Sequence, residues 1–251
     1  MFRIYCFGAA RLAALIFAIW IVHCGDGVQA MSVTPLSVEL TSSGASNKAT
    51  LRVHNNAATP IPVEFQITRV TIDEKGATLS EPAPDQFLVF PPQKAIPAGG
   101  TQSFRVQWLG APDLKQSETY IISVNQLPVD LGASRSGVQM VYNFSVIVNV
   151  APMNAKSAVE LLSADIVTDK NNVRRPRIKV TNTGNRHALL SDGSILLSGG
   201  GWSEVIDSPD LRAAIGLGLV QPGKIRNFVL GAEIPKHVSR LEAQLRQTNT
   251  N

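Results

Sequence analysis

Side chains that could carry covalent or metal chemistry are few and scattered along the 251 residues. Three histidines lie beyond residue 30: His54, His187 and His237. Their spacing is not that of metal ligands, and we expect them to be surface or turn residues. Asp73 and Glu74 precede a Lys–Gly pair, which is typical of a turn. The glycine clusters at 199–201 and 216–218 do not open a helix within a βαβ unit, so they predict no phosphate site.

The sequence therefore predicts no enzyme, and it predicts neither a metal site nor a nucleotide or other cofactor. The chemistry that it does offer is apolar recognition by residues 138–150. All seven even positions of this stretch are apolar: Val138, Met140, Tyr142, Phe144, Val146, Val148 and Val150. Four of the six odd positions are polar. Alternation of this kind gives a β-strand with one continuous apolar ridge, about 3.3 Å per residue in length.

Two interpretations of this 13-residue stretch remain open. It could be a long core strand, or one half could pack its own core while the other half offers the ridge to a partner. An extended apolar edge is an aggregation hazard, so a protein that keeps one would use it for strand addition.

The first 30 residues are typical of a secretory signal peptide. Arg3 and Arg11 supply positive charge, residues 12–22 form an uncharged apolar run, and Val28-Gln29-Ala30 is a cleavage pattern. This run is too short for stable membrane insertion, which needs about 20 apolar residues. We expect export and cleavage after Ala30. Both cysteines lie in this segment, so the exported chain would contain no disulfide.

Composition indicates a folded protein rather than a disordered or nucleic-acid-binding one. The chain is 44% hydrophobic and 17% charged, with a formal net charge of +4. Its basic residues are not clustered, and aromatic residues make up only 6%. A base-stacking or phosphate-binding surface is therefore not predicted.

Short alternating segments separated by turn residues indicate an all-β fold. Residues 49–54, 62–70 and 104–108 alternate with period two, and Asn55-Asn56 follows the first of them. Such spacing favours a β-sandwich or barrel. Residues 238–247 are the best helical candidate, although a strand is also compatible with them.

An internal repeat predicts two related sandwiches rather than one. Residues 51–55 resemble residues 178–182, and Pro97-Ala98-Gly99 before Phe104 resembles Gln221-Pro222-Gly223 before Phe228. The two matches occur in the same order at nearly the same offset. The predicted division comprises a signal peptide at 1–30, a first domain at 31–152, a linker at 153–157 and a second domain at 158–251.

The sequence resembles a known family, the periplasmic chaperones of chaperone–usher pilus assembly. Within that family it looks closest to the archaic branch. The resemblance is carried by the order and spacing of several short motifs in both halves. They are Phe90-Pro91-Pro92, Ile96-Pro97-Ala98-Gly99, Phe104-Arg105-Val106, Ser117-Glu118-Thr119-Tyr120, Gln126-Leu127-Pro128, Ala151-Pro152, residues 180–187 and residues 219–223.

The resemblance implies a fold and a mechanism. The fold would be two immunoglobulin-like β-sandwich domains in a boomerang arrangement. The last strand of the first domain would complete a pilin-like subunit that lacks its own final strand, and the subunit would then pass to an outer-membrane usher. The donor face would be Val138, Met140, Tyr142 and Phe144, with Val146 at its end. Glu118 matches an acidic family residue that helps to set the angle between the domains.

One implied feature has no match. Many family members hold the subunit's terminal carboxylate with two basic residues, and the corresponding positions here fall near Ser37 and Ile147. Neither is basic, although a carboxylate needs a charge-assisted donor. Arg52, Arg105 and Arg135 are candidate substitutes, and their spacing does not choose among them.

A different class of function also remains open: an exported two-domain β-sandwich that acts as an adhesin or a carbohydrate-binding protein. Such a protein needs exposed aromatic side chains on a concave face. The candidates are Trp108, Trp202, Tyr120 and Tyr142.

Overall fold

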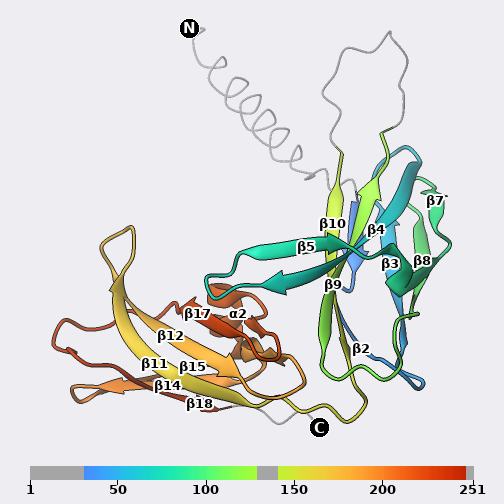
Figure 1. Cartoon of the computed structure of the whole chain (residues 1–251). Helices are drawn as coiled ribbons and strands as arrows, with labels where there is room; N and C mark the ends of the chain where they lie inside the picture. Colours follow the sequence, from blue (N-terminus) through green and yellow to red (C-terminus); the bar gives the residue numbers. More distant parts are fainter. Residues whose placement is uncertain (1–30, 129–140, 247–251) are drawn as a thin grey trace, which may run out of the picture.

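The computed structural model describes residues 31–128 and 141–246 of the chain. Within these ranges the regular structure is mainly β-strand, arranged as two lobes that meet at an angle (Figure 1). One lobe is built from residues 31–151 and the other from residues 159–246, and each has its own hydrophobic core.

The first lobe is a sandwich of two sheets. One is four-stranded, in the order β1 (Met31–Thr34), β3 (Lys48–Asn55), β8 (Thr101–Trp108) and β6 (Phe87–Phe90). The other is six-stranded, in the order β2 (Ser37–Thr41), β10 (Asn143–Ala151), β9 (Glu118–Gln126), β4 (Ile61–Ile72) and β5 (Thr78–Pro82), with β7 (Gln93–Ile96) also paired to β4. A short 3₁₀ helix, η1 (Pro84–Gln86), precedes β6.

The predicted alternation of apolar and polar residues places alternate side chains between the two sheets, where they form the core of this sandwich. In β8, Phe104, Val106 and Trp108 point into the core and are at most 3% exposed, whereas Arg105 between them is exposed. Phe87 packs edge-on against both Trp108 and Tyr120, with ring centroids 5.1 and 5.0 Å apart. Aromatic packing between the two sheets therefore fixes their spacing at this end of the core.

The second lobe contains smaller sheets. Three strands pair in the order β11 (Val159–Thr168), β12 (Arg174–Asn182) and β17 (Ile225–Val229), and three in the order β15 (Trp202–Ile206), β14 (Ser194–Gly199) and β18 (Glu242–Arg246). A two-stranded sheet joins β13 (Ala188–Leu189) and β16 (Leu219–Val220), beside η2 (Leu190–Asp192) and the helix α2 (Ser208–Ile215).

The internal repeat is reproduced in the pairing of the strands. Leu51 lies opposite Phe104 in the first lobe, and Ile178 lies opposite Phe228 in the second. The asparagine that ends each repeated strand, Asn55 or Asn182, is fully buried and binds the matching corner. Asn55 Nδ2 donates to the Ile96 carbonyl at 3.0 Å, and Asn182 Nδ2 donates to the Val220 carbonyl at 3.0 Å. The same asparagine clamp, a buried side chain that binds the backbone of the adjoining corner, thus occurs twice, at Asn55 and at Asn182.

Of the two interpretations of residues 238–247, the helix is wrong and the strand is present, within the described residues up to 246. This segment contains β18, which pairs with β14, and its Ala243 and Leu245 pack against the second core. The helix of this lobe lies instead at α2, where Asp207 precedes a proline in the first turn and Gly216 follows the last residue. Tertiary pairing has overridden the helix propensity of residues 242–246.

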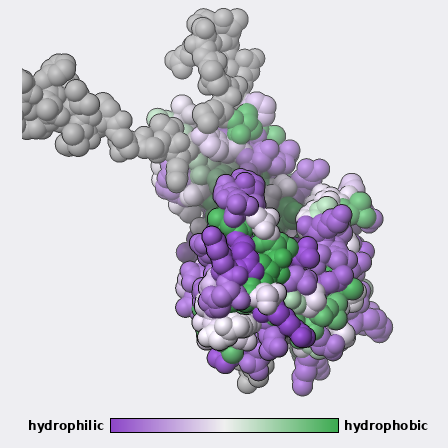
Figure 2. Space-filling view, turned by 90° about the vertical axis from the view of Figure 1, so that its left-hand side faces the viewer, coloured by the Kyte–Doolittle hydropathy of each residue, from purple (hydrophilic) through white to green (hydrophobic). Residues whose placement is uncertain are grey.

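Figure 2 views the molecule from the side of the second lobe. This surface is mostly hydrophilic, with a small hydrophobic area near its centre. No helix within the two described ranges is long and apolar enough to cross a membrane.

Candidate functional site

The strand β10 changes from an interior strand to an edge strand along its length. It pairs with β9 from Asn143 to Val150, but it pairs with β2 only from Ile147 to Ala151. Among the strands of residues 31–128 and 141–246, residues 143–146 therefore have a neighbour on one side only. The backbone groups on the other side are available for pairing with an added strand.

The open edge arises because the chain passes from one sheet to the other between β1 and β2. Residues 31–34 pair with β3 in the four-stranded sheet, and the chain then crosses to pair with β10 from Ser37 onward. Leu36, at the crossing, is 51% exposed, and its carbonyl accepts a hydrogen bond of 2.9 Å from the Ile147 amide. No other described strand pairs with this edge of β10 on the Asn143 side of this bond.

The apolar ridge of β10 runs from the core out to this edge. Val146, Val148 and Val150 are completely buried in the first core. Tyr142 and Phe144 are only partly buried and pack against the margin of the same core. Val146 thus belongs to the core of its own sandwich, whereas Tyr142 and Phe144 lie where a partner can reach them. Val138 and Met140, the other predicted members of the ridge, lie outside the described residues.

The positions where the resemblance implies a carboxylate anchor carry no charge. Ser37 and Ile147 are direct partners across β2 and β10. Arg52 and Arg105 are not brought to this place, because both are exposed side chains of β3 and β8 in the four-stranded sheet. Arg135 lies outside the described residues.

Glu118 makes its ion pair within the first lobe. Its Oε2 atom lies 2.9 Å from Arg69 Nη2 and accepts a hydrogen bond of 2.5 Å from the Tyr120 hydroxyl. Burial, followed by the hydrogen bond to Glu118, raises the pKa of Tyr120 well above its usual range, so the phenol keeps the proton that it donates. The described contacts of Glu118 do not reach the second lobe.

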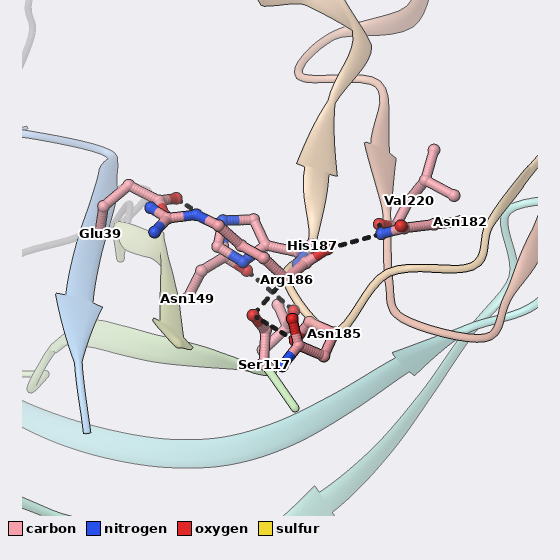
Figure 3. Close-up of polar contacts among 9 residues, drawn as sticks. Glu39, Ser117, Asn149, Asn182, Asn185, Arg186, His187 and Val220 are labelled. Atoms are coloured by element: carbon pink, nitrogen blue, oxygen red, sulfur yellow. Dashed lines mark hydrogen bonds and ion pairs between the residues drawn. The ribbon is translucent and has the colours of Figure 1, made fainter. Parts of the chain in front are cut away.

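Other residues join the two lobes, and sequence reasoning missed them (Figure 3). Glu39 of β2 contacts three of these residues: its Oε2 atom is 2.6 Å from His187 Nε2 and 3.7 Å from Arg186 Nη2. Its Oε1 atom accepts a bond of 2.8 Å from Asn149 Nδ2. His187 lies in the connection between β12 and β13, as a turn residue would, but its side chain is only 3% exposed, so the expectation of a surface position is wrong.

A second set of contacts joins the lobes at the tip of the β4–β5 hairpin, which reaches toward the second lobe in Figure 1. Gln221 Nε2 donates to the Val70 carbonyl at 2.9 Å, and its Oε1 accepts from the Ile72 amide at 2.8 Å. Glu74 lies 2.9 Å from Lys179 Nζ and 3.0 Å from Asn227 Nδ2. These hydrogen bonds lower the pKa of Glu74, so its carboxylate is the favoured form.

The aromatic side chains required by the carbohydrate-binding alternative are mostly unavailable. Trp108 is 3% exposed and Tyr120 is fully buried, and both pack in the first core. Trp202 is partly buried against the second core, in the other lobe from Tyr142. Among residues 31–128 and 141–246, no group of three or more His, Cys, Asp or Glu side chains could hold a metal ion.

A family model described as pili and flagellar-assembly chaperone, PapD N-terminal domain, matches residues 30–156, slightly more than half of the chain. The chain belongs to this family. Pilus-assembly chaperones are binding proteins rather than enzymes, which is the class of function that the sequence predicted. No curated protein sequence matches the chain.

Solved structures agree with this chaperone family in fold. The class 5 fimbriae chaperone CfaA has a TM-score of 0.52 at 15% identity, covering 87% of this chain and 99% of that one. A chain of the CsuC–CsuE chaperone–subunit complex, from the archaic Csu pili of Acinetobacter baumannii, has a TM-score of 0.52 at 12% identity, covering 86% and 97%. The YadV chaperone has a TM-score of 0.52 at 14% identity, covering 86% and 92%. The predicted pair of immunoglobulin-like sandwiches is confirmed.

Proposed function

We propose that this chaperone acts in the periplasm, where it stabilises pilus subunits by donor-strand complementation and delivers them to an outer-membrane usher. The observation that carries the proposal is the open edge of β10 at residues 143–146, which continues the apolar ridge of the same strand. A subunit that lacks one strand could pair with this edge and cover the ridge with its own core.

The donor face in this proposal consists of Val138, Met140, Tyr142 and Phe144. Val146 is held in the first core and would anchor the strand at its inner end. Alternate side chains set the register, because a shift of one residue would turn the ridge away from the subunit. Burial of four such side chains contributes roughly 6–12 kcal/mol before ordering costs, at about 1.5–3 kcal/mol each.

The proposed division of the chain is that predicted from the sequence: a signal peptide at 1–30, domains at 31–152 and 158–251, and a linker at 153–157. Support comes from the two separate hydrophobic cores, one on each side of the proposed linker. The archaic branch is supported by the resemblance of the sequence motifs.

The test is capture of a subunit by the tagged mature chain in its own periplasm. The variants Tyr142→Asp and Phe144→Asp place a charge on the ridge, and Ser145→Asp places the same charge on the exposed opposite face of the same strand. We expect a small pilin-like subunit to co-purify with the parent chain and with Ser145→Asp, and to be lost from both ridge variants. Equal capture by all four proteins would refute the proposed donor face.

A further inference from the structure

The outward face of the four-stranded sheet carries basic and hydroxyl side chains and no carboxylate. On its two central strands, β3 and β8, the side chains that point away from the core are Lys48, Thr50, Arg52, His54, Thr101, Ser103, Arg105 and Gln107. On the flanking strands they are Ser32, Thr34, Leu88 and Phe90. The three cations of this face therefore have no acidic neighbour on the same face of the sheet.

The register of β3 and β8 gathers the three cations. Arg105 lies opposite Thr50, while Arg52 lies opposite Ser103 and Lys48 opposite Gln107. Arg105 is thus a diagonal neighbour of both Arg52 and Lys48, at about 7–8 Å between backbones. Two hydroxyl groups, those of Thr50 and Ser103, occupy the other diagonal of the square that holds Arg52 and Arg105. This square offers two guanidinium groups and two hydroxyl donors to one anion.

None of these cations is neutralised within the parts of the chain that the structure describes. The ion pairs and side-chain hydrogen bonds of residues 31–128 and 141–246 do not include Lys48, Arg52 or Arg105. Arg105 is a diagonal neighbour of two like charges, which repel it across the same face of the sheet. Arg105 lies within about one Debye length, about 8 Å at physiological salt, of both Arg52 and Lys48, so salt screens these two repulsions only in part.

Apolar surface adjoins the cations at the edge strand β6. Phe90 lies opposite Arg105 and is 64% exposed, and Leu88 lies opposite Gln107 and is 48% exposed. Leu88 also borders a hollow of about 410 Å³ between β6 and β4, lined mainly by apolar side chains such as Phe65 and Ile67. The basic square and this hollow therefore form one continuous surface across β6.

We propose that this surface docks an acidic segment of a partner protein, whose carboxylates lie over Arg52, Arg105 and Lys48 and whose apolar side chain contacts Phe90 and the hollow. A polypeptide fits better than an anionic membrane. Three basic residues contribute only about 3 kcal/mol of attraction to anionic lipid, at about 1 kcal/mol each. The hollow adds a site shaped for a discrete side chain. The basic square lies on the opposite sheet from the open edge of β10, so its cations are separate from the proposed donor face.

The test uses a fluorescent 12-residue peptide of eight glutamates and four leucines, titrated with the full mature chain and followed by anisotropy at low and high salt. We expect binding that weakens as salt rises. The double variant Arg52→Glu/Arg105→Glu should bind at least tenfold more weakly. The control Lys170→Glu/Lys236→Glu makes the same change in net charge at exposed sites of the second lobe and should bind within twofold of the parent.

Two further arms keep the result decisive. Thermal unfolding followed by circular dichroism checks that each variant is folded. If the charge-reversed variant does not fold, Arg52→Gln/Arg105→Gln replaces it and should bind at least fivefold more weakly. Absence of peptide binding by the parent, or equal binding by parent and double variant, overturns the proposal. Binding to phosphatidylglycerol vesicles without binding to the peptide also overturns it, in favour of a membrane-facing surface.

Discussion

Replacing Glu39 by alanine should loosen the junction between the two domains. Glu39 accepts hydrogen bonds from two side chains that are almost completely buried, those of Asn149 and His187. Without Glu39 each donor is left without this acceptor, at a cost of about 1–3 kcal/mol per group. The Glu39 side chain is itself 38% exposed, so water can replace part of the loss. Arg186 is also partly exposed and at 3.7 Å, so it adds little.

The net expectation for Glu39→Ala is a loss of about 2–3 kcal/mol in the free energy of unfolding. For a chain of this size each kcal/mol lowers Tm by about 2–4 °C, so Tm should fall by about 4–12 °C. Calorimetry measures this change. Glu39→Gln keeps an acceptor and should lose less. Glu204→Ala, which removes an exposed carboxylate on β15, is the matched control and should leave Tm unchanged.

A distance measurement separates loss of the junction from general destabilisation. The chain beyond residue 30 contains no cysteine, so Lys94→Cys and Ser203→Cys supply one spin-label site in each domain. We expect a narrow distance distribution in the parent and a broader one in Glu39→Ala well below its Tm. A Tm within 1 °C of the parent together with an unchanged distribution would refute the assigned role of Glu39.

Three further predictions concern the clamp, the buried phenol and the linker. Asn55→Ala should lower the free energy of unfolding by about 2–4 kcal/mol, because several backbone groups of one corner lose their hydrogen-bond partner. Chemical denaturation measures this change, and Asn171→Ala, at an exposed position, should leave the free energy of unfolding unchanged. Tyr120 keeps its proton in the folded state, whereas in the unfolded chain it loses the proton at its ordinary pKa of about 10. Above that pH the parent should therefore lose stability more steeply with rising pH than Tyr120→Phe. Equal slopes of the free energy of unfolding between pH 8 and 11 would contradict this. Gly184→Ala would press a methyl group against the Lys156 carbonyl and displace the linker, so limited proteolysis should cut the linker faster than in the parent. Gly223→Asn is the control, because its added side chain meets open space, and its linker should be cut at the parent's rate.

Features with a local signature could be predicted from the sequence. The repeat was visible because the same short strand, asparagine and Pro–Gly turn recur in the same order, and the structure uses both copies in equivalent registers. The ridge of β10 was visible because period-two alternation depends only on neighbouring residues. Its division into a buried part and an open edge was not visible, since that depends on where β2 begins to pair.

Features that depend on contacts between distant parts of the chain could not be predicted. Glu39 and His187 are far apart in sequence, and nothing in either neighbourhood marks them as partners. The same holds for Gln221 and Val70. The helix α2 is a different case, because Asp207, the following Ser–Pro pair and Gly216 form a start and stop pattern that could have located it.

The two sets of contacts between the domains restrict the way in which they can move. One set surrounds Glu39 and His187, and the other lies at the β4–β5 hairpin with Gln221 and Glu74. A body attached at a single point can rotate about three axes, but a body attached at two separated points can rotate only about the line that joins them. While both attachments hold, opening and closing of the angle between the domains is therefore a swing about one axis, and any wider motion first requires one attachment to break.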